Sequence, residues 1–173
     1  MKRIVIVLLA AMVLAGCSKP TMLETVNDVQ AEPVAVTARR IQVVLPPELT
    51  APALQNTDTG ELYLCEDYSV TVQTVQAGDL AKTIRNATGM EKENLQIIKT
   101  RQGEAKRYQW VGTTGGEKGA QIGRGCILDD GAYHYVLTTL ADEAAAEKVQ
   151  AAWKEIFTSF CLATEREPVS TGS

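Results

Sequence analysis

The sequence predicts one α+β domain, in which a single antiparallel sheet of about six to seven strands is flanked by helices and a long C-terminal helix packs on the sheet. Three observations support this prediction. Several short segments alternate apolar and polar residues, as half-buried strands do. Glycine-containing turns separate the later segments, and short turns join antiparallel neighbours. The last periodic segment has the apolar spacing of an amphipathic helix.

Periodic apolar residues extend from Arg39 to about Leu162, a span of about 125 residues that suffices for one hydrophobic core. The segment before it is polar, carries Pro20 and Pro33 and has neither a strand nor a helix period, which is typical of a flexible tether. The predicted parts are a cleaved signal peptide (1–16), a lipidated tether (17–38), the α+β domain (39–163) and a disordered tail (164–173).

The first strand is predicted over residues 39–45, where apolar residues alternate. A pair of prolines ends it, because proline has no N–H to donate to a strand ladder. Residues 61–66 and 68–75 follow as a hairpin, in which Val70 and Val72 face the core and the alternation slips at its last valine.

A short helix follows the hairpin. Asp79 is the expected N-cap, Leu80, Ile84 and Ala87 share one face, and Gly89 ends the helix. Four further strands then form an antiparallel meander joined by glycine-containing turns. We expect them over residues 95–101, 106–113, 121–128 and 132–140.

The C-terminal helix is expected to begin after a cap at Asp142. Its apolar residues recur at helical spacing and form one stripe: Val149, Trp153, Ile156, Phe157 and Phe160. A stripe of this kind buries one face against a sheet. We therefore interpret it as core packing rather than as a cofactor site.

The N-terminus has the organisation of a secretory signal. Lys2 and Arg3 precede an apolar run over residues 4–15, which is shorter than the about 20 residues that a transmembrane helix needs. The run therefore predicts export rather than a membrane span.

Cys17 is the predicted lipidation site. The segment Leu14-Ala15-Gly16-Cys17 resembles the bacterial lipobox, in which small residues precede a cysteine that is acylated before cleavage. Each buried methylene contributes about 0.8 kcal/mol, so two or three acyl chains such as palmitate would hold the mature protein on a membrane. The alternative is an ordinary secretory signal with a chance cysteine. We expect a lipid anchor at the extracytoplasmic face of a bacterial membrane.

The mature chain is acidic. Removing residues 1–16 takes away two of the 17 basic residues and none of the 21 acidic ones, which leaves 15 minus 21, a formal charge of −6. Lys106 and Arg107, an adjacent basic pair of the domain, have the acidic residues Glu104 and Glu117 nearby in the sequence. This balance disfavours nucleic acid as a partner and disfavours charge-driven binding to anionic lipid.

His134 is the one histidine of the sequence, so a single chain cannot build a two-histidine metal site. Neither a cofactor motif nor a recognisable nucleophile accompanies it, and we expect a structural or rim histidine. A hydrolase that pairs His134 with Asp129 or Asp130 is the weaker alternative.

Five residues form a candidate ligand or partner surface, although the sequence leaves open whether they are core or surface. They are Tyr108, Trp110, Tyr133, His134 and Tyr135. Exposed aromatic side chains among them would favour a binding role.

Two glycine-containing segments admit two interpretations each. Asp129-Asp130-Gly131 fits a type I′ turn better than a cation site, because most ligands of a calcium loop are missing. The run over residues 115–125 superficially resembles a phosphate loop, but it joins two predicted strands. We favour a hairpin with close backbone approach, with a mobile recognition loop as the alternative.

Three cysteines remain in the domain: Cys65, Cys126 and Cys161. Cys65 and Cys126 lie in predicted strands and could form a disulfide, whereas Cys161 is expected on the buried face of the last helix. We favour three free thiols.

The order of these elements resembles the superfamily of the photosystem extrinsic protein PsbP and the Ran-binding Mog proteins, which includes small bacterial lipoproteins of unknown role. The residues that carry the resemblance are Leu45-Pro46 at the end of the first strand, residues 133–140 as the last strand, and the helix residues Trp153, Ile156, Phe157, Phe160 and Leu162. The resemblance implies a sheet flanked by helices and a non-catalytic role in binding or stabilising a larger complex. No family site can be carried over onto residues of this chain.

Taken together, these features predict a lipid-anchored accessory or binding protein without catalytic activity, with no cofactor or metal and with an unknown envelope protein as its partner. A lipoprotein that binds a small molecule or a peptide is the alternative.

Overall fold

The computed structural model describes residues 36–49, 51–56, 60–116 and 119–166. The predicted signal peptide, Cys17 and residues 167–173 lie outside the described residues. The strands are β1 (Arg39–Gln42), β2 (Leu54–Asn56), β3 (Gly60–Leu64), β4 (Tyr68–Gln76), β5 (Ile98–Gln102), β6 (Ala105–Gly116), β7 (Gly119–Asp129), β8 (Tyr133–Asp142) and β9 (Cys161–Arg166). The helices are α1 (Leu80–Thr88) and α2 (Ala146–Ser159), and single 3-10 turns lie at Lys92–Asn94 and Glu143–Ala145.

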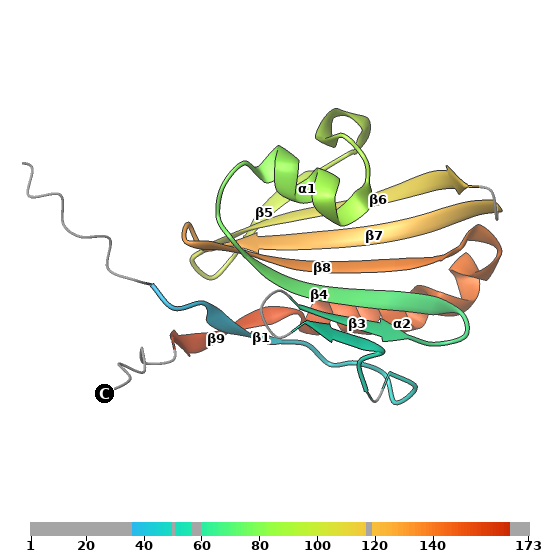
Figure 1. Ribbon diagram of the computed structural model, residues 1–173, viewed down its shortest axis with the longest axis horizontal. Coiled ribbons are helices and arrows are strands. Elements are labelled where there is room, and N and C mark those ends of the chain that lie inside the picture. The colour runs from blue at the N-terminus through green and yellow to red at the C-terminus, as the bar shows by residue number, and fades with distance from the viewer. Residues whose placement is uncertain (1–35, 50, 57–59, 117–118, 167–173) are drawn as a thin grey trace, which may run out of the picture. The chain divides into compact units, whose positions relative to one another are not determined.

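Within the described residues, seven antiparallel strands form one sheet in the order β2-β3-β4-β8-β7-β6-β5 (Figure 1). The predicted meander is the run from β5 to β8, and the predicted hairpin is the pair β3 and β4. The prediction of an α+β fold with an antiparallel sheet and a C-terminal helix packed on it is confirmed.

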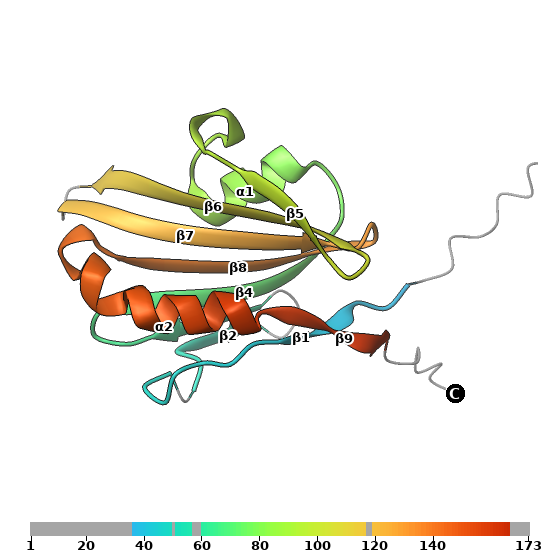
Figure 2. The same ribbon diagram turned by 180° about the vertical axis from the view of Figure 1, so that it is seen from behind.

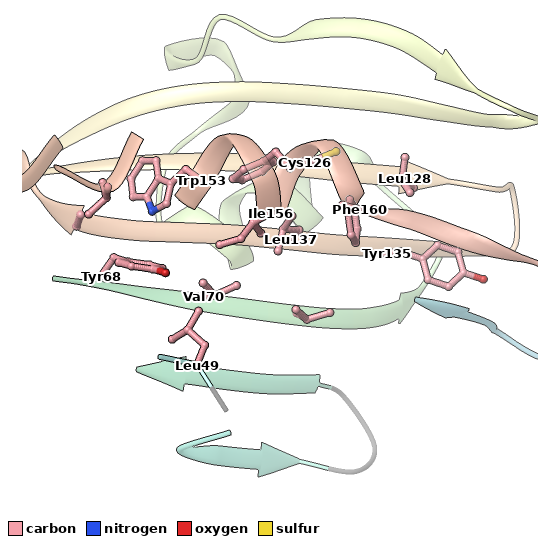
Figure 3. Packing of buried hydrophobic residues seen from close by; sticks show 14 of the residues in the cluster. Leu49, Tyr68, Val70, Cys126, Leu128, Tyr135, Leu137, Trp153, Ile156 and Phe160 are labelled. Carbon is pink, nitrogen blue, oxygen red and sulfur yellow. The ribbon is translucent and has the colours of Figure 1, made fainter. Parts of the chain in front are cut away.

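The two helices cover opposite faces of the sheet, which we call the α1 face and the α2 face. Figure 1 shows α1 on the near face, and Figure 2 shows α2 along the other. The larger core lies between the sheet and α2, where Val70, Leu137, Ile156 and Phe160 are fully buried (Figure 3). A smaller cluster lies under α1 and consists of Ile84, Trp110, Ile127 and Val136.

The predicted alternation of apolar and polar residues slips at Val75 because both faces of the sheet are covered by a helix. Val70 and Val72 point into the core under α2, whereas Val75 lies on the other face of β4 and lines a hollow together with Gln73 and Thr83 of α1. The alternation along β4 is therefore regular, because successive strand residues point to opposite faces. Both faces of this strand carry valines.

The two ends of α1 are as predicted. Asp79 accepts a hydrogen bond from the backbone N–H of Ala81 at 2.9 Å, which satisfies one donor at the helix start. Gly89 ends the helix with φ of 71°, in the left-handed region that glycine adopts at little cost. Its N–H donates to the Arg85 carbonyl at 2.7 Å.

The stripe of α2 is confirmed as core, but both ends of the helix differ from the prediction. Asp142 precedes a 3-10 turn and makes no side-chain cap, and its carboxylate instead accepts a hydrogen bond from Gln121 Nε2 at 3.5 Å. The helix ends at Ser159, and Phe160 is buried just beyond it as the C-cap residue. The chain then continues as β9, so Leu162 is not helical.

The first predicted strand does not join the main sheet. β1 ends at Gln42 and pairs with β9, with Ile41 opposite Leu162. This ribbon is held to the main sheet by the N–H of Arg39, which donates to the Tyr135 hydroxyl at 2.7 Å. Because β9 continues to Arg166, residues 164–166 are strand and the predicted tail begins too early.

The turn after β7 forms the predicted hairpin in a different conformation. A type I′ turn needs positive φ at both central residues, whereas among the described residues only glycines have positive φ, here Gly131 at 90°. Asp129 instead accepts from the N–H of Gly131 at 2.8 Å, and Asp130 accepts from the N–H of Ala132 and of Tyr133. These carboxylates build the turn.

All three cysteines of the described residues are free thiols. Cys126 is fully buried in β7, and this burial raises the pKa of its thiol to about 11. Cys65 follows β3 and is half-buried, and Cys161 begins β9 rather than lying on a helix. The disulfide considered for Cys65 and Cys126 is not formed.

Candidate functional site

The five residues of the predicted surface do not come together. Tyr133 and Tyr135 lie on the α2 face, whereas Tyr108, Trp110 and His134 lie on the α1 face. Tyr135, Trp110 and His134 are 0%, 4% and 2% exposed, so they are core residues rather than an exposed aromatic patch.

Tyr135 connects three parts of the fold. Its hydroxyl accepts the N–H of Arg39 and donates to Asp130 Oδ2 at 3.0 Å. The centroid of its ring lies 6.2 Å from the ring centroid of Tyr133. Burial of a hydroxyl costs little free energy when partners of this kind satisfy it. The residue therefore holds the β1–β9 ribbon and the β7–β8 turn together.

His134 fastens α1 to the sheet. Its Nδ1 lies 2.8 Å from Thr83 Oγ1 of α1. Burial lowers the pKa of His134 below its ordinary value, although the nearby carboxylates of Asp129 and Asp130 act in the opposite direction. A neutral, buried and hydrogen-bonded imidazole fits the structural role expected from the sequence.

A groove of about 400 Å³ lies on the α1 face, where α1 does not cover the sheet. Its floor is made of small and hydroxyl-bearing residues of the strands: Ser69, Thr71, Gly112, Gly123 and Thr138. Its walls are larger apolar side chains: Met90, Leu95, Trp110 and Leu140. An apolar wall with a few polar groups is the usual composition of a small-molecule pocket.

The groove exists because the sequence provides a short helix and glycine-rich strands. α1 is nine residues long, and Figure 1 shows that it lies over only part of the sheet. The Trp110 ring lies against the backbone of Gly125, where a Cβ atom would collide with it. A Cβ atom at Gly112 would lie 3.0 Å from the end of the Leu95 side chain, which is a tight contact rather than a collision. This is the close backbone approach that the glycine run predicts.

The described side chains of the groove are uncharged except for that of Arg124, which comes from the opposite face. Arg124 directs its guanidinium over the Phe157 ring, 4.4 Å from the centroid, and so belongs to the α2 core. Within the described part of the chain, no three His, Cys, Asp or Glu side chains are placed to hold a metal ion. Chemically, the groove suits a neutral ligand with apolar surface and a few hydrogen-bonding groups.

Sequence reasoning identified Trp110 but not its neighbours in the groove. Ser69 and Thr71 alternate with the buried valines of β4, so the pattern marks them only as the face away from the core. Met90 lies in the connection after α1. Leu95 lies in the same connection, because β5 begins at Ile98 and not at residue 95 as predicted. That these residues share one hollow depends on the pairing of β4 with β8, which the sequence does not specify.

Comparison with known protein families gives a match at the N-terminus. Residues 1–18 match the family described as the prokaryotic membrane lipoprotein lipid attachment site. The chain carries a lipoprotein attachment site. This match supports membrane anchoring, and the predicted lipoprotein attachment site is confirmed. Acylation of Cys17 itself stays a prediction. None of the helices among the described residues is long and apolar enough to span a bilayer.

Solved structures are similar in fold. The chain is similar to LpqN of Mycobacterium tuberculosis, described as involved in cell envelope biogenesis, with a TM-score of 0.51, 11% identity, and 73% of this chain and 85% of that chain covered. It is also similar to the Ran-binding protein Mog1p of Saccharomyces cerevisiae (TM-score 0.47, 12% identity, 73% and 96% covered). A third similar structure is that of PsbP (CyanoP) of Synechocystis sp. PCC 6803, with a TM-score of 0.46, 10% identity, and 75% of this chain and 94% of that chain covered.

The likeness to LpqN shows a shared fold. The solved structures similar to this chain also include both kinds of protein named by the sequence resemblance. A comparison with curated protein sequences found no match.

Proposed function

We propose that this protein is a non-catalytic binding protein, lipid-anchored at the extracytoplasmic face of a bacterial membrane, where it supports a cell-envelope complex. The observation that carries the proposal is the lipid attachment site at residues 1–18, ahead of one small domain. The description of LpqN as involved in cell envelope biogenesis supports the envelope as the place of action.

Two buried side chains support a role without catalysis. His134 is 2% exposed with its Nδ1 against Thr83, and the Cys126 thiol is fully buried. A catalytic base or nucleophile must reach its substrate within about 3 Å, which neither side chain can do here. Both residues contribute to packing instead.

A small-molecule-binding lipoprotein is a second candidate, and the groove on the α1 face favours it. Its volume of about 400 Å³ lies within the range of about 300 to 1,000 Å³ that ligand pockets occupy. Trp110 offers a large apolar surface, and Thr71 and Thr138 offer hydroxyls for hydrogen bonds. An envelope lipid fragment or another neutral apolar molecule has this chemistry.

Crosslinking on intact cells, followed by capture of the tagged protein and mass spectrometry of proteins and extracted small molecules, tests the proposal. One stoichiometric envelope protein is the result expected for the accessory role. Recovery of the lipoprotein alone with a defined small molecule would favour the second candidate instead.

The Cys17→Ser variant is the control for the anchor. We expect it to lose palmitate labelling. Exported behind a signal peptide that is cleaved without acylation, it should also leave the membrane fraction, while its melting temperature in solution stays that of the mature chain with Cys17. A Cys17→Ser protein that remains fully membrane-bound would contradict the lipid anchor.

A further inference from the structure

The second half of β6 has an open edge. β5 pairs with β6 only as far as Gln109, which lies opposite Ile98, whereas β6 continues to Gly116. Among the described residues, no strand pairs with β6 beyond Gln109 on the side away from β7. Figures 1 and 2 both show this end of β6 as the border of the sheet. About half of the strand therefore has one partner instead of two.

The register shows which backbone groups point outward. Gln102 and Ala105 lie opposite each other across a two-residue turn, and such a pair is hydrogen-bonded, so residues 105, 107 and 109 of β6 bond to β5. Because bonded and non-bonded pairs alternate along an antiparallel ladder, the residues at 112, 114 and 116 bond to β7. The N–H and C=O groups of Val111 and Thr113 then point away from the sheet, and both residues are exposed.

This edge lacks the features that usually prevent edge pairing. Edge strands are commonly protected by charged residues, prolines or bulges. β5, itself an edge, carries Lys99 and Arg101, both exposed. The β6 segment from 111 to 116 reads Val-Gly-Thr-Thr-Gly-Gly, with neither a charge nor a proline. The two parts of the same border therefore differ in chemistry.

The two most exposed large apolar side chains of the described residues flank the open edge. Ile98 is 65% exposed and Val111 is 56% exposed. Ile98 lies opposite Gln109, two residues before Val111, so both side chains project from the α2 face as diagonal neighbours. They offer apolar contact to a strand that would lie beside β6 in line with β5.

We propose that this edge binds an extended, uncharged polypeptide segment of an envelope protein, with an apolar residue opposite Val111, as an added strand of the sheet. Strand addition obtains its affinity from main-chain hydrogen bonds and its selectivity from alternate side chains. The inference rests on the proposed accessory role and names the surface and the class of partner. A partner without negative charge also avoids repulsion by a mature chain of net charge 15 minus 21, or −6.

A second copy of this chain fits the edge less well. A two-fold pairing of β6 centred on Thr113 places Val111 opposite a glycine, residue 115, which has no side chain to cover it. A pairing centred on Gly112 or on Val111 places residues of the second copy opposite Gln109, which β5 already occupies. A foreign strand has neither restriction.

Binding of a neutral, labelled decapeptide of alternating threonine and valine to the full mature chain, made soluble as Cys17→Ser, tests the proposal. A copy of the peptide with N-methyl groups on the amides of one edge cannot form the ladder, and we expect it to bind at least tenfold more weakly. Thr113→Pro removes an outward N–H but leaves the bonds to β7, and edge strands tolerate proline. We expect it to weaken binding at least tenfold, whereas Thr113→Ser binds like the wild type.

Val111→Lys provides a second, independent variant, since it keeps every backbone donor and places a charge on the edge. We expect Val111→Lys to bind the peptide at least tenfold more weakly than the wild type, as Thr113→Pro does. Melting temperatures check that each variant folds. The proposal is overturned if the wild type does not bind the peptide, if the N-methylated peptide binds equally well, or if the protein forms a dimer that Thr113→Pro dissociates. Such a failure leaves the capture of an envelope partner on cells unaffected, so the two proposals fail separately.

Discussion

The two faces of the sheet are built differently. On the α2 face, a helix of 14 residues covers a cluster of 15 buried side chains, whereas on the α1 face a helix of nine residues covers a cluster of four. Most of the free energy from apolar burial therefore comes from the α2 face. The α1 face keeps a groove that packing does not fill. One face stabilises the fold, and the other leaves room to bind.

The largest expected effect of a single substitution lies on the α2 face. Trp153→Ala removes a ring that is 6% exposed in the main core, and we expect a loss of about 3 to 5 kcal/mol in the free energy of unfolding, measured with urea. The indole N–H of Trp153 has no partner among the described residues, so the contribution is one of packing. Trp153→Phe should therefore lose much less. Unchanged unfolding of Trp153→Ala would refute this assignment of the core.

The C-terminus of α2 is held by one charged side chain. Arg107 of β6 donates to the carbonyls of Phe157 at 2.6 Å and Phe160 at 3.3 Å. A cation is favourable at a helix C-terminus, and hydrogen bonds to charged groups contribute about 1.5 to 3 kcal/mol. We expect Arg107→Leu to lose about this amount in urea unfolding and Arg107→Lys to lose less. Equal stability of Arg107→Leu and the wild type would show that packing alone docks the helix.

On the α1 face, a glycine is expected to matter through a single close contact. Gly125→Ala places a Cβ atom against the Trp110 ring, and overpacking of this kind costs about 1 to 3 kcal/mol. Tryptophan fluorescence should shift as the ring moves. Gly78→Ala is the matched control, because nothing lies within 4 Å of the added atom, and it should stay within about 0.5 kcal/mol of the wild type.

The attachment of α1 should also depend on pH. Burial holds the pKa of His134 in the folded protein below the ordinary value of about 6.5 that it regains on unfolding. As the pH falls through this region, the unfolded chain takes up a proton before the folded protein does, so the free energy of unfolding decreases from pH 7 towards pH 5 and levels off below the folded pKa. His134→Gln should flatten this slope in urea titrations. A wild-type stability that rises towards pH 5 would contradict the buried neutral histidine.

Sequence periodicity predicted the α2 face well and the α1 face poorly, for a physical reason. Val149, Trp153 and Val70 repeat at the spacing of their elements because one face of each is buried, so the pattern encodes the burial directly. The caps of α1 are local signals and were also predicted correctly. The groove is different, because Thr71, Leu95 and Gly112 meet through strand order and register, which no local pattern specifies.

The same distinction explains the errors. Residues 39–45 have a strand pattern, but the pattern does not name the partner, and the partner is β9 rather than the main sheet. Tyr133, His134 and Tyr135 alternate along β8, so the two tyrosines share the α2 face and His134 lies on the α1 face. Their proximity in sequence gave no information on a shared site.

The central contrast is that the α2 face stabilises the fold and the α1 face keeps a groove for binding. Capture on cells with two matched leucine variants tests it most directly. Leu140 is 39% exposed and lines the groove on the α1 face, whereas Leu64 is 54% exposed on β3 and lies outside it. Each exposed leucine can be replaced by glutamate with a change in stability of about 0.5 kcal/mol or less. We predict that Leu140→Glu loses at least tenfold of the bound small molecule and that Leu64→Glu retains it. Full recovery with Leu140→Glu would contradict a binding role for the α1 face.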